Sequence, residues 1–462
     1  MPIFTPDTLA RWTSGRWLAP PRGTITGFGA DTRRLGPGQM FVALKTEKRD
    51  GHDFLAAALA AGAAAALVAV AQPGCALPQL VVADPLTAFQ AVAREHRQAF
   101  PGPVVGVTGS AGKTSTKDLL ARLLGANPGA ADVSPVLATP GNLNNAIGVP
   151  LTLTQLDASV HAYAVVEAGI NLVGEMATLA GMIAPDIAIV TLVAPAHLEG
   201  LGSLEGVARE KARLAAAVRP SGVAIFPSAC TAFAAFRDLA VPTLPVGGPG
   251  APVSFSVEHG EAGTELRLSG PGIPAGPYAL PRMTEGMAQN AALALTAAFR
   301  LGVPADLIRQ RLAQWQPAAL RGEWIRQADQ LLYLDCYNAN PASMSDALAT
   351  FTRSAPAALP RLFLIGGMEE LGPDSARYHT EVGGRLQLRP EDELWLIGGQ
   401  AAAFRTGALA AGARAAQITL ATSLAPLAAR LAGFQGAVFI KGSRRYQLET
   451  LVPEAVTGPL HA

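Results

Sequence analysis

The stretch that decides the fold reads Val104-Val105-Gly106-Val107-Thr108-Gly109-Ser110-Ala111-Gly112-Lys113-Thr114-Ser115. Residues 104–107 predict a buried strand, and residues 113–124 predict the helix that follows it. Glycines between a strand and a helix let backbone N–H groups turn towards an anion, and the helix N-terminus adds a positive dipole. The stretch therefore predicts a phosphate-binding loop.

The residues that close this loop have predictable roles. The Lys113 ammonium can reach the β- and γ-phosphates of a nucleotide, and the Thr114 hydroxyl can bind Mg²⁺. The pattern is GxxGKT, because Val107 stands five residues before Gly112 where the longer P-loop pattern requires glycine. A glycine-rich turn with a surface lysine is the alternative, and the strand-to-helix context and the GKT triplet argue against it. The loop alone leaves kinase, ATPase, GTPase and ligase open.

The rest of the chain predicts an α/β protein of three domains, at residues 1–97, 98–316 and 317–462. The first reads as a small mixed α/β domain with short strands, turns and one Ala-rich helix. In the second, strands at 162–166 and 187–193 alternate with helices, which predicts βαβ units and a parallel sheet. Residues 242–281 predict an antiparallel side piece of this central P-loop domain, and a helix from about 287 to 301 follows it.

The third domain predicts a second, Rossmann-like α/β sheet. Its expected strands lie at 331–335, 361–365, 393–397 and 437–440, and its expected helices include 342–352 and 424–432.

Composition limits the classes of function. Half of the 462 residues are hydrophobic and the formal net charge is +1, so nothing indicates long disorder, a nucleic-acid partner or a membrane surface. The three cysteines form no CxxC pair, which favours a reducing compartment and no structural zinc. Met1 opens into a stretch without a signal-peptide pattern, and the Ala-rich residues 54–71 predict a soluble helix running into a strand. We therefore expect a cytoplasmic protein.

Two polar groups follow expected strands of the central sheet. Glu167 comes directly after one strand, and His197 and Glu199 come after another. The carboxyl ends of parallel strands bind ligands, and a carboxylate and an imidazole beside a triphosphate would suit Mg²⁺. A capping or core histidine is the alternative for His197. Lys211 lies in a helical stretch, and in isolation it reads as a solvated lysine.

At this point the chain resembles the Mur ligases over essentially its whole length. The nucleotide loop is common to these ligases and folylpolyglutamate synthases, whereas the TPGNLNN and YNANP strings favour the family member that adds D-alanyl-D-alanine. The strings that carry the resemblance lie at residues 31–33, 41–45, 49–54, 108–114, 139–145, 166–169, 196–199, 335–341 and 441–444.

The resemblance implies a reaction. An ATP-dependent amide ligase would add D-alanyl-D-alanine to UDP-N-acetylmuramoyl-tripeptide in peptidoglycan precursor synthesis, the pathway on which cell-wall biogenesis, cell shape and cell division depend. The tripeptide carboxylate would attack the γ-phosphate of ATP to form an acyl phosphate and ADP. The dipeptide amine would then displace phosphate. The expected cofactors are ATP and Mg²⁺, and the expected state is a monomer.

The resemblance also implies residue roles. The catalytic residues would be Lys113, Lys211 and His197. ATP would be bound by Gly109, Ser110, Ala111, Gly112, Lys113, Thr114, Ser115, Asn290, Arg321 and Asp335. The UDP-substrate would be bound by Asp31, Thr32, Arg33, Lys45, Asp50, Gly51, His52, Asn142, Asn144 and Asn145. The dipeptide would meet Asn338, Asn340, Lys441, Ser443 and Arg444. Metal would be held by Thr114, Glu167, His197 and Lys211, the last aligning with a lysine carbamylated to N6-carboxylysine in this family.

Three positions depart from the family pattern. Leu192 stands where asparagine is usual, Arg213 where glutamate is usual, and Gly286 lies where a Gly-x-His string usually precedes the nucleotide asparagine. Two alternatives therefore stay open. One is another amino-acid ligase of the same family, and the other is a non-catalytic paralogue that binds UDP-sugar or nucleotide. A P-loop kinase is a weaker third.

Overall fold

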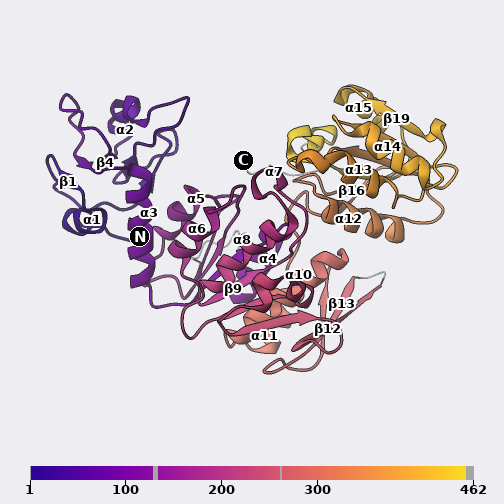
Figure 1. The fold of residues 1–462 in the computed structure, drawn as a ribbon, viewed down its shortest axis with the longest axis horizontal. Coiled ribbons are helices and arrows are strands. Elements are labelled where there is room, and N and C mark those ends of the chain that lie inside the picture. Colours follow the sequence, from indigo (N-terminus) through magenta and orange to yellow (C-terminus); the bar gives the residue numbers. More distant parts are fainter. Residues whose placement is uncertain (1, 128–133, 261–262, 454–462) are drawn as a thin grey trace.

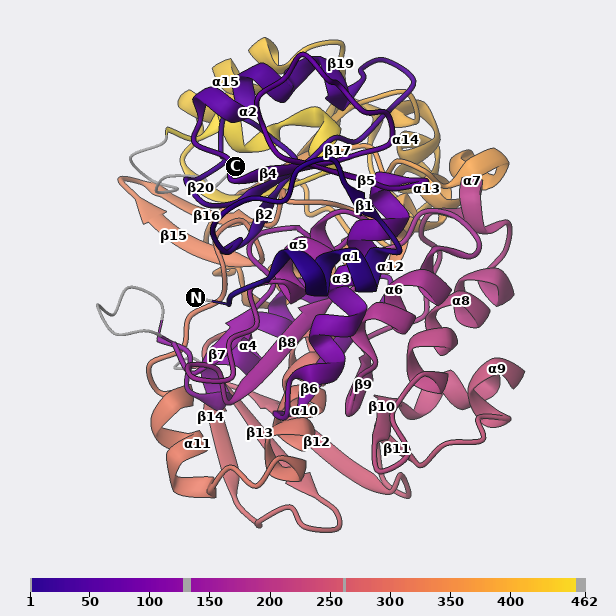
Figure 2. The same ribbon diagram turned by 90° about the vertical axis from the view of Figure 1, so that its left-hand side faces the viewer.

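The computed structural model describes residues 2–127, 134–260 and 263–453 and arranges them as three α/β units (Figure 1). The N-terminal and C-terminal units lie at opposite ends and the central unit lies between them, so the three form an open V. After a turn of 90°, both end units lie on the same side of the central unit (Figure 2). The α/β class expected from the sequence is confirmed by three sheets in which parallel pairs dominate.

The N-terminal unit is built on a five-stranded sheet in the order β1-β5-β4-β3-β2. Only β1 runs antiparallel to its neighbour within this sheet of described strands. The elements are α1 (Pro6–Thr13), β1 (Arg16–Trp17), β2 (Phe28–Gly29), β3 (Met40–Val42), α2 (Leu55–Ala60), β4 (Ala65–Val68) and β5 (Gln79–Val81). The Ala-rich stretch thus forms a short helix and a fully buried strand, as predicted. None of the helices in the described ranges is long and apolar enough to span a bilayer.

Helix α3 (Pro85–Ala99) joins the N-terminal unit to the central one. It begins after Asp84, whose carboxylate accepts a hydrogen bond from the Thr87 N–H. The helix packs against α1 of the N-terminal unit and against α5 (Gly148–Leu153) and α6 (Glu175–Ile183) of the central unit. Arg97 near its end is only 1% exposed and donates to Asp186 and to the carbonyls of Ile183 and Ala184 at the end of α6. This partly buried ion pair anchors α3 on the central unit.

The central unit has a nine-stranded sheet in the order β14-β13-β12-β11-β10-β9-β6-β8-β7. The strands are β6 (Val104–Thr108), β7 (Val136–Ala138), β8 (Tyr163–Glu167), β9 (Ile187–Val190), β10 (Val223–Pro227), β11 (Thr243–Gly247), β12 (Val253–His259), β13 (Thr264–Ser269) and β14 (Pro277–Leu280). The antiparallel piece expected at 242–281 is confirmed for β12 to β14, whereas β11 extends the parallel part. The strand expected at 187–193 ends at Val190 because the chain then turns over the phosphate loop.

Helices cover both faces of the central sheet. They are α4 (Lys113–Leu124), α5 (Gly148–Leu153), α6 (Glu175–Ile183), α7 (Leu198–Leu201), α8 (Leu204–Ala216), α9 (Ala234–Arg237), α10 (Glu285–Arg300) and α11 (Ala305–Leu312). In β6, Val105 and Val107 pack in the core with α4 and α10, whereas Val104 packs in the core with α5, α6 and α8. Side chains alternate between faces along a strand, so a strand covered on both sides is apolar throughout. This explains why the strand at 104–107 could be predicted from its continuous hydrophobicity.

The C-terminal unit has a six-stranded sheet in the order β15-β16-β20-β17-β18-β19, with β15 antiparallel to β16. Its elements are β15 (Glu323–Gln327), β16 (Gln330–Leu334), α12 (Pro341–Ser354), β17 (Arg361–Gly366), α13 (Ser375–Gly383), β18 (Glu393–Ile397), α14 (Ala401–Ala410), β19 (Ile418–Ala421), α15 (Leu424–Ala432) and β20 (Gly436–Lys441). The four predicted strands and two predicted helices are confirmed. Strands β15 and β19 were not predicted, because both are sheet edges with mixed burial and so lack a continuous apolar run.

Six short 3₁₀ helices complete the described elements: Gly51–Phe54, Ser228–Ala232, Gly372–Asp374, Ala415–Gln417, Arg444–Tyr446 and Leu448–Leu451.

Candidate functional site

The loop between β6 and α4 leaves the start of α4 open. The residue that precedes the helix is Gly112, which has no side chain to accept the first-turn N–H groups. Unsatisfied N–H groups and the helix dipole together favour an anion at this end. The geometry matches the phosphate-binding loop expected from the sequence.

Two positions in this loop require glycine because side chains of neighbouring segments lie too close to the backbone for a Cβ. Gly109 has φ +155°, and a Cβ there would lie 1.8 Å from the Thr191 Oγ1. Gly112 has φ +77°, and a Cβ there would lie 2.0 Å from the Asn290 Nδ2. The loop is therefore held tightly between the end of β9 and helix α10.

Lys113 lies at the start of α4 and points back across the loop. Its ammonium donates to the Gly109 carbonyl at 2.9 Å. Burial lowers the pKa of Lys113, and the nearby Glu167 carboxylate opposes that shift. The amine is thus already positioned over the loop, where it can exchange a carbonyl partner for a phosphate oxygen.

Glu167 occupies the carboxyl end of β8 and is 1% exposed. Its Oε1 accepts a hydrogen bond from the Asn144 Nδ2 at 2.7 Å, and its backbone N–H donates to the Thr139 Oγ1 at 2.9 Å. Its Oε2 is buried without a hydrogen-bond partner among the described residues. A buried carboxylate oxygen without a donor is costly unless a cation completes it.

The side chains around Glu167 fit Mg²⁺ bound together with a nucleotide. Within the described ranges no cluster of three or more His, Cys, Asp or Glu side chains is placed to hold a metal without other ligands. Thr114 lines the same cavity as Glu167. One carboxylate, one hydroxyl and phosphate oxygens form the kind of oxygen ligand set that Mg²⁺ uses beside phosphates.

His197 and Lys211 form a second group near the loop. The His197 Nδ1 lies 2.5 Å from the Glu370 Oε2 of the C-terminal unit. Both residues have positive φ, +52° for His197 and +62° for Glu370, a backbone conformation that is strained for residues other than glycine. Lys211 is only 2% exposed, and burial and the charge of Lys113 hold its pKa well below the usual range. The sequence alone would have placed Lys211 in solvent, whereas the fold buries it.

The C-terminal unit forms the other wall of the site. Lys441 is 1% exposed, and its ammonium donates to the Asp335 Oδ2 at 2.6 Å and to the carbonyls of Asp335 and Asn338. These three acceptors occupy the three N–H bonds of Lys441 in this arrangement. The guanidinium of Arg321 lies 3.9 Å from the ring centre of Tyr337. Lys441 therefore shapes the chain after β16, and Arg321 and Tyr337 form a flat surface beside the cavity.

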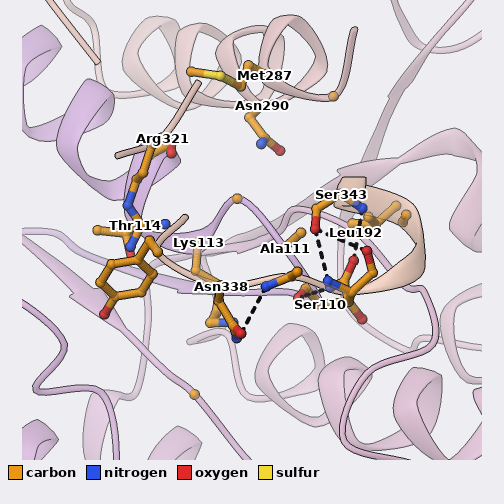
Figure 3. Close-up of a pocket in the computed structure, with 18 of the residues that line it drawn as sticks. Ser110, Ala111, Lys113, Thr114, Leu192, Met287, Asn290, Arg321, Asn338 and Ser343 are labelled. Carbon is orange, nitrogen blue, oxygen red and sulfur yellow. Dashed lines mark hydrogen bonds between the residues drawn. The ribbon is translucent and has the colours of Figure 1, made fainter. Parts of the chain in front are cut away.

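Polar contacts join the central and C-terminal units across the site. The Asn340 Nδ2 donates to the Ser110 carbonyl at 3.0 Å, so the start of α12 is bonded directly to the phosphate loop. The Gly286 N–H donates to the Asp346 Oδ2 at 3.1 Å. Figure 3 shows Met287 and Asn290 on α10 together with loop residues such as Ala111 and Lys113, and Asn338 and Ser343 of the C-terminal unit in the same pocket. The site is thus enclosed by two units that sequence position alone does not bring together.

The cavity between these walls has a volume of about 690 Å³, within the range of about 300–1,000 Å³ usual for small-molecule sites. Most of the residues expected from the sequence to serve ATP, metal and dipeptide line it, together with three of the residues expected to bind the UDP-substrate. They are Ser110, Ala111, Gly112, Lys113, Thr114, Ser115, Asn142, Asn144, Asn145, Glu167, His197, Asn290, Arg321, Asp335, Asn338, Asn340 and Lys441. Gly109, Lys211, Ser443 and Arg444 are not among the lining residues.

Two of these exceptions have other partners. The Ser443 N–H donates to the Gly367 carbonyl, and the Arg444 guanidinium pairs with Glu449. Both contacts lie within the C-terminal unit, so they tie down the loop that follows β20.

The remaining expected residues lie in the N-terminal unit, away from the lining of the cavity. Asp31 pairs with Arg33, and Lys45 lies 3.5 Å from Asp50. The His52 Nδ1 is 2.6 Å from the Asp50 Oδ1, and its Nε2 accepts the N–H groups of residues 69 and 70. Hydrogen bonding by His52 lowers the pKa of Asp50 to about 2. The imidazole therefore fixes the turn at 50–52, and the exposed cations remain available to an anionic ligand.

Several residues of the cavity were not predicted from the sequence. They are Gly169, Ile170, Asn171, Glu175, Phe255, Thr284, Glu285, Met287, Gln289, Tyr337, Ala339, Ala342, Ser343 and Asp346. Leu192 and Gly286, two of the departures from the family pattern, also line the cavity. Tyr337 and Ala339 lie inside the YNANP string, and Asn171 lies four residues after Glu167. Their position next to predicted site residues could have been used to predict them. Phe255 comes from the strand β12, and nothing local in its sequence marked it. Leu192 contributes its backbone carbonyl, which accepts the Ser110 N–H.

Comparisons with known families agree along the chain. The Mur ligase family, catalytic domain, matches residues 24–95; the Mur ligase middle domain matches residues 107–298; and the Mur ligase, glutamate ligase domain, matches residues 320–444.

Two curated relatives cover nearly the whole chain. The UDP-N-acetylmuramoyl-tripeptide–D-alanyl-D-alanine ligase of Escherichia coli K12 is 34% identical over 444 residues, covering 93% of each chain. The enzyme of the same name from Bacillus subtilis 168 is 30% identical over 441 residues, covering 94% of each chain.

Solved structures give the same picture. A crystal structure of MurF from Acinetobacter baumannii is 30% identical with a TM-score of 0.86 and covers 98% of both chains. The MurF ligase from Thermotoga maritima in complex with ADP is 26% identical with a TM-score of 0.78, covering 92% of this chain and 96% of that one. The fold and the order of the three units are therefore similar throughout.

Proposed function

The chain belongs to the Mur ligase family, and we propose that it joins D-alanyl-D-alanine to UDP-N-acetylmuramoyl-tripeptide in an ATP-dependent, ADP-producing reaction of peptidoglycan synthesis. The observation that carries the proposal is a cavity at the open start of α4, lined by residues of both the central and C-terminal units. Sequence identities of 34% and 30% to ligases of this name, over nearly the whole chain, support the assignment of the dipeptide and the tripeptide as substrates.

The chemistry begins with a carboxylate that is a poor electrophile. Phosphorylation of the tripeptide carboxylate removes its negative charge and creates a good leaving group. The open N–H groups of α4 and the Lys113 ammonium, which starts only 2.9 Å from the Gly109 carbonyl, would bind the transferring phosphates. The protein's contribution is positioning and charge stabilisation, and no nucleophilic side chain is required.

Magnesium is the cation that the site would hold with ATP. Thr114 and the unpartnered oxygen of Glu167 are the side chains for it, with His197 as a further ligand once it leaves Glu370. The ion would neutralise charge on the transferring oxygens. Asn144 orients Glu167 through its 2.7 Å hydrogen bond.

Lys211 is proposed to carry a carbamate. A buried lysine with a lowered pKa has more of its amine neutral, and a neutral amine adds to CO₂ to give a carbamate and a proton. The product would be an anion beside Lys113 that can hold a second Mg²⁺. Intact-protein mass measured with and without bicarbonate, using Lys211→Gln as the control, tests this assignment.

The outer units would present the two peptides. The exposed cations of the N-terminal unit, with the turn at 50–52, would bind the UDP-sugar, and Asn142 and Asn145 would meet the substrate at the cavity edge. Asn338 and Asn340 would face the incoming dipeptide, whose free amine attacks the acyl carbon and releases phosphate. Lys441 would act there by fixing Asn338. The division of roles follows domains at 1–97, 98–316 and 317–462.

We further propose that the enzyme works in the cytoplasm as a monomer, serving cell-wall growth and division. One chain supplies the P-loop, the candidate cation site and the C-terminal wall of the cavity.

A coupled phosphate assay tests the proposal. Phosphate release should require ATP, UDP-N-acetylmuramoyl-tripeptide and D-alanyl-D-alanine together, and single amino acids should not replace the dipeptide. Lys113→Ala should abolish release while leaving the circular dichroism spectrum unchanged. Release with a single amino acid in place of the dipeptide would indicate a different ligase, and binding without any release would indicate the non-catalytic alternative.

A further inference from the structure

A second lysine of α4 lies buried one turn after Lys113. Lys117 is 3% exposed, and its ammonium donates to the Thr139 carbonyl at 2.8 Å. The same ammonium lies 2.8 Å from the Asp118 Oδ1, whose side chain is 36% exposed. A buried ammonium is unfavourable unless it is hydrogen-bonded, and a charge-assisted bond to a carbonyl is strong in this environment. The Lys117–Thr139 contact is therefore a firm tie between α4 and the segment after β7.

Thr139 carries that tie to the end of β8. It is 1% exposed, and its hydroxyl accepts the Glu167 N–H at 2.9 Å. The Thr139 N–H donates to the Val165 carbonyl, so Thr139 is hydrogen-bonded to two residues at the end of β8, Val165 and Glu167. A movement of Thr139 would move the backbone of Glu167.

The Glu167 carboxylate is oriented by the same loop. Asn144, five residues after Thr139, donates to the Glu167 Oε1. The Glu167 backbone N–H and its Oε1 are thus both hydrogen-bonded to residues 139–145, in addition to the pairing of β8 with β6 at Val107. Lys117 connects this loop to the helix that starts at the phosphate site. The remaining oxygen, Oε2, is buried and has no hydrogen-bond partner in the part of the chain that the structure describes.

We propose that Lys117 is a positioning residue for the cation site: through Thr139 it sets the Glu167 carboxylate against the start of α4. The inference rests on the proposed function, because it concerns Mg²⁺ bound with a nucleotide at that site. Lys117 does not line the cavity, so it acts through other residues. Loss of a group that orients a metal ligand typically weakens metal binding by about 10–100-fold.

The test is Mg²⁺-dependent ADP binding, measured by titration calorimetry in saturating Mg²⁺ and in EDTA. Lys117→Met keeps the length of the side chain and removes its donor. We expect Mg²⁺ to strengthen ADP binding about tenfold less in Lys117→Met than in the unmodified protein, with ADP affinity in EDTA unchanged. Equal loss of affinity in both conditions would mean a general structural defect and would overturn the inference.

Two further variants separate the possible failures. Arg122→Met removes a cation from the last turn of the same helix, where its partners are Ala126, Asn127 and Gln314, and it should leave the effect of Mg²⁺ unchanged. Glu167→Gln should reduce the effect at least as much as Lys117→Met. If Glu167→Gln has no effect, the cation site of the proposed function is wrong. If only Lys117→Met has no effect, this inference alone is wrong.

Thr139→Val provides the test if Lys117→Met does not fold. Valine keeps the shape and the carbonyl of Thr139 but removes the acceptor of the Glu167 N–H. It should reduce the effect of Mg²⁺ in the same direction, and a value equal to that of the unmodified protein would contradict the proposed chain of contacts.

Discussion

Replacing Gly112 by alanine tests how tightly the phosphate loop is held. Gly112 has φ +77°, a backbone conformation that costs a residue with a Cβ about 1–2 kcal/mol of folding stability. The new Cβ would also lie 2.0 Å from the Asn290 Nδ2, and relieving such an overlap in a packed site costs about 1–3 kcal/mol more. We therefore expect Gly112→Ala to destabilise the central unit by about 2–5 kcal/mol.

Gly302→Ala is the matched control. Gly302 has nearly the same φ, +79°, but beyond its chain neighbours a Cβ there would have no heavy atom of the described residues within 4 Å. It should lose only the backbone part, about 1–2 kcal/mol. At about 2–4 °C per kcal/mol for a domain of this size, Gly112→Ala should unfold about 5 °C lower than Gly302→Ala in scanning calorimetry at one scan rate.

The two variants should also differ in nucleotide binding. Asn290 lines the cavity and must move away from a residue with a side chain at position 112. We expect ADP to bind about tenfold more weakly to Gly112→Ala, a loss of about 1.4 kcal/mol, and normally to Gly302→Ala. Equal unfolding midpoints together with equal ADP affinities would refute the reasoning.

Two other predictions concern the C-terminal unit. Asn340→Asp keeps an oxygen for the Ser343 N–H but loses the donor to the Ser110 carbonyl, so the variant should keep its unfolding midpoint while its KM for ATP rises. Asn340→Ala should show the same rise and should also lose about 1 kcal/mol of stability, because the helix cap is removed. A normal KM for ATP in both variants would contradict the role of this contact. Burial raises the pKa of Asp392, but hydrogen bonds from Arg361 and Arg389 outweigh it and leave the pKa below the usual 3.8. The ionised Asp392 carboxylate therefore stabilises the folded state above its unfolded pKa, and this stabilisation is lost as the pH falls through the lower folded pKa. Below pH 4, the unfolding temperature should fall more steeply with decreasing pH in the unmodified protein than in Asp392→Asn.

The chemistry of the phosphate loop could be predicted because it depends on neighbours in the sequence. The apolar run at 104–107, the loop glycines Gly109 and Gly112, and the Lys113-Thr114 pair are enough to specify a strand, a turn with positive φ and an open helix start. The same holds for Glu167, since a polar residue directly after a buried strand lies at the carboxyl end of the sheet. The alternation of strands and helices was sufficient to predict two parallel sheets.

Other features depend on contacts that local patterns do not contain. Lys211 reads as a solvated lysine on a helix, and only packing beneath the loop makes it 2% exposed. Lys441 and Asp335 are 106 residues apart, and the parallel pairing of β16 with β20 brings their side chains within 2.6 Å. The edge strands β15 and β19 were missed for a related reason, because strands with mixed burial have no continuous apolar pattern.

Local sequence was sufficient to predict a phosphate-binding loop at 109–115, because backbone sterics and hydrogen-bonding capacity are properties of consecutive residues. Packing of distant segments was needed to place the buried charges near that loop, the contacts that link Lys117 and Thr139 to Glu167, and the residues of the C-terminal unit that line the cavity. Those arrangements arise from the packing of distant segments, whose energies depend on burial and distance rather than on the order of residues along the chain.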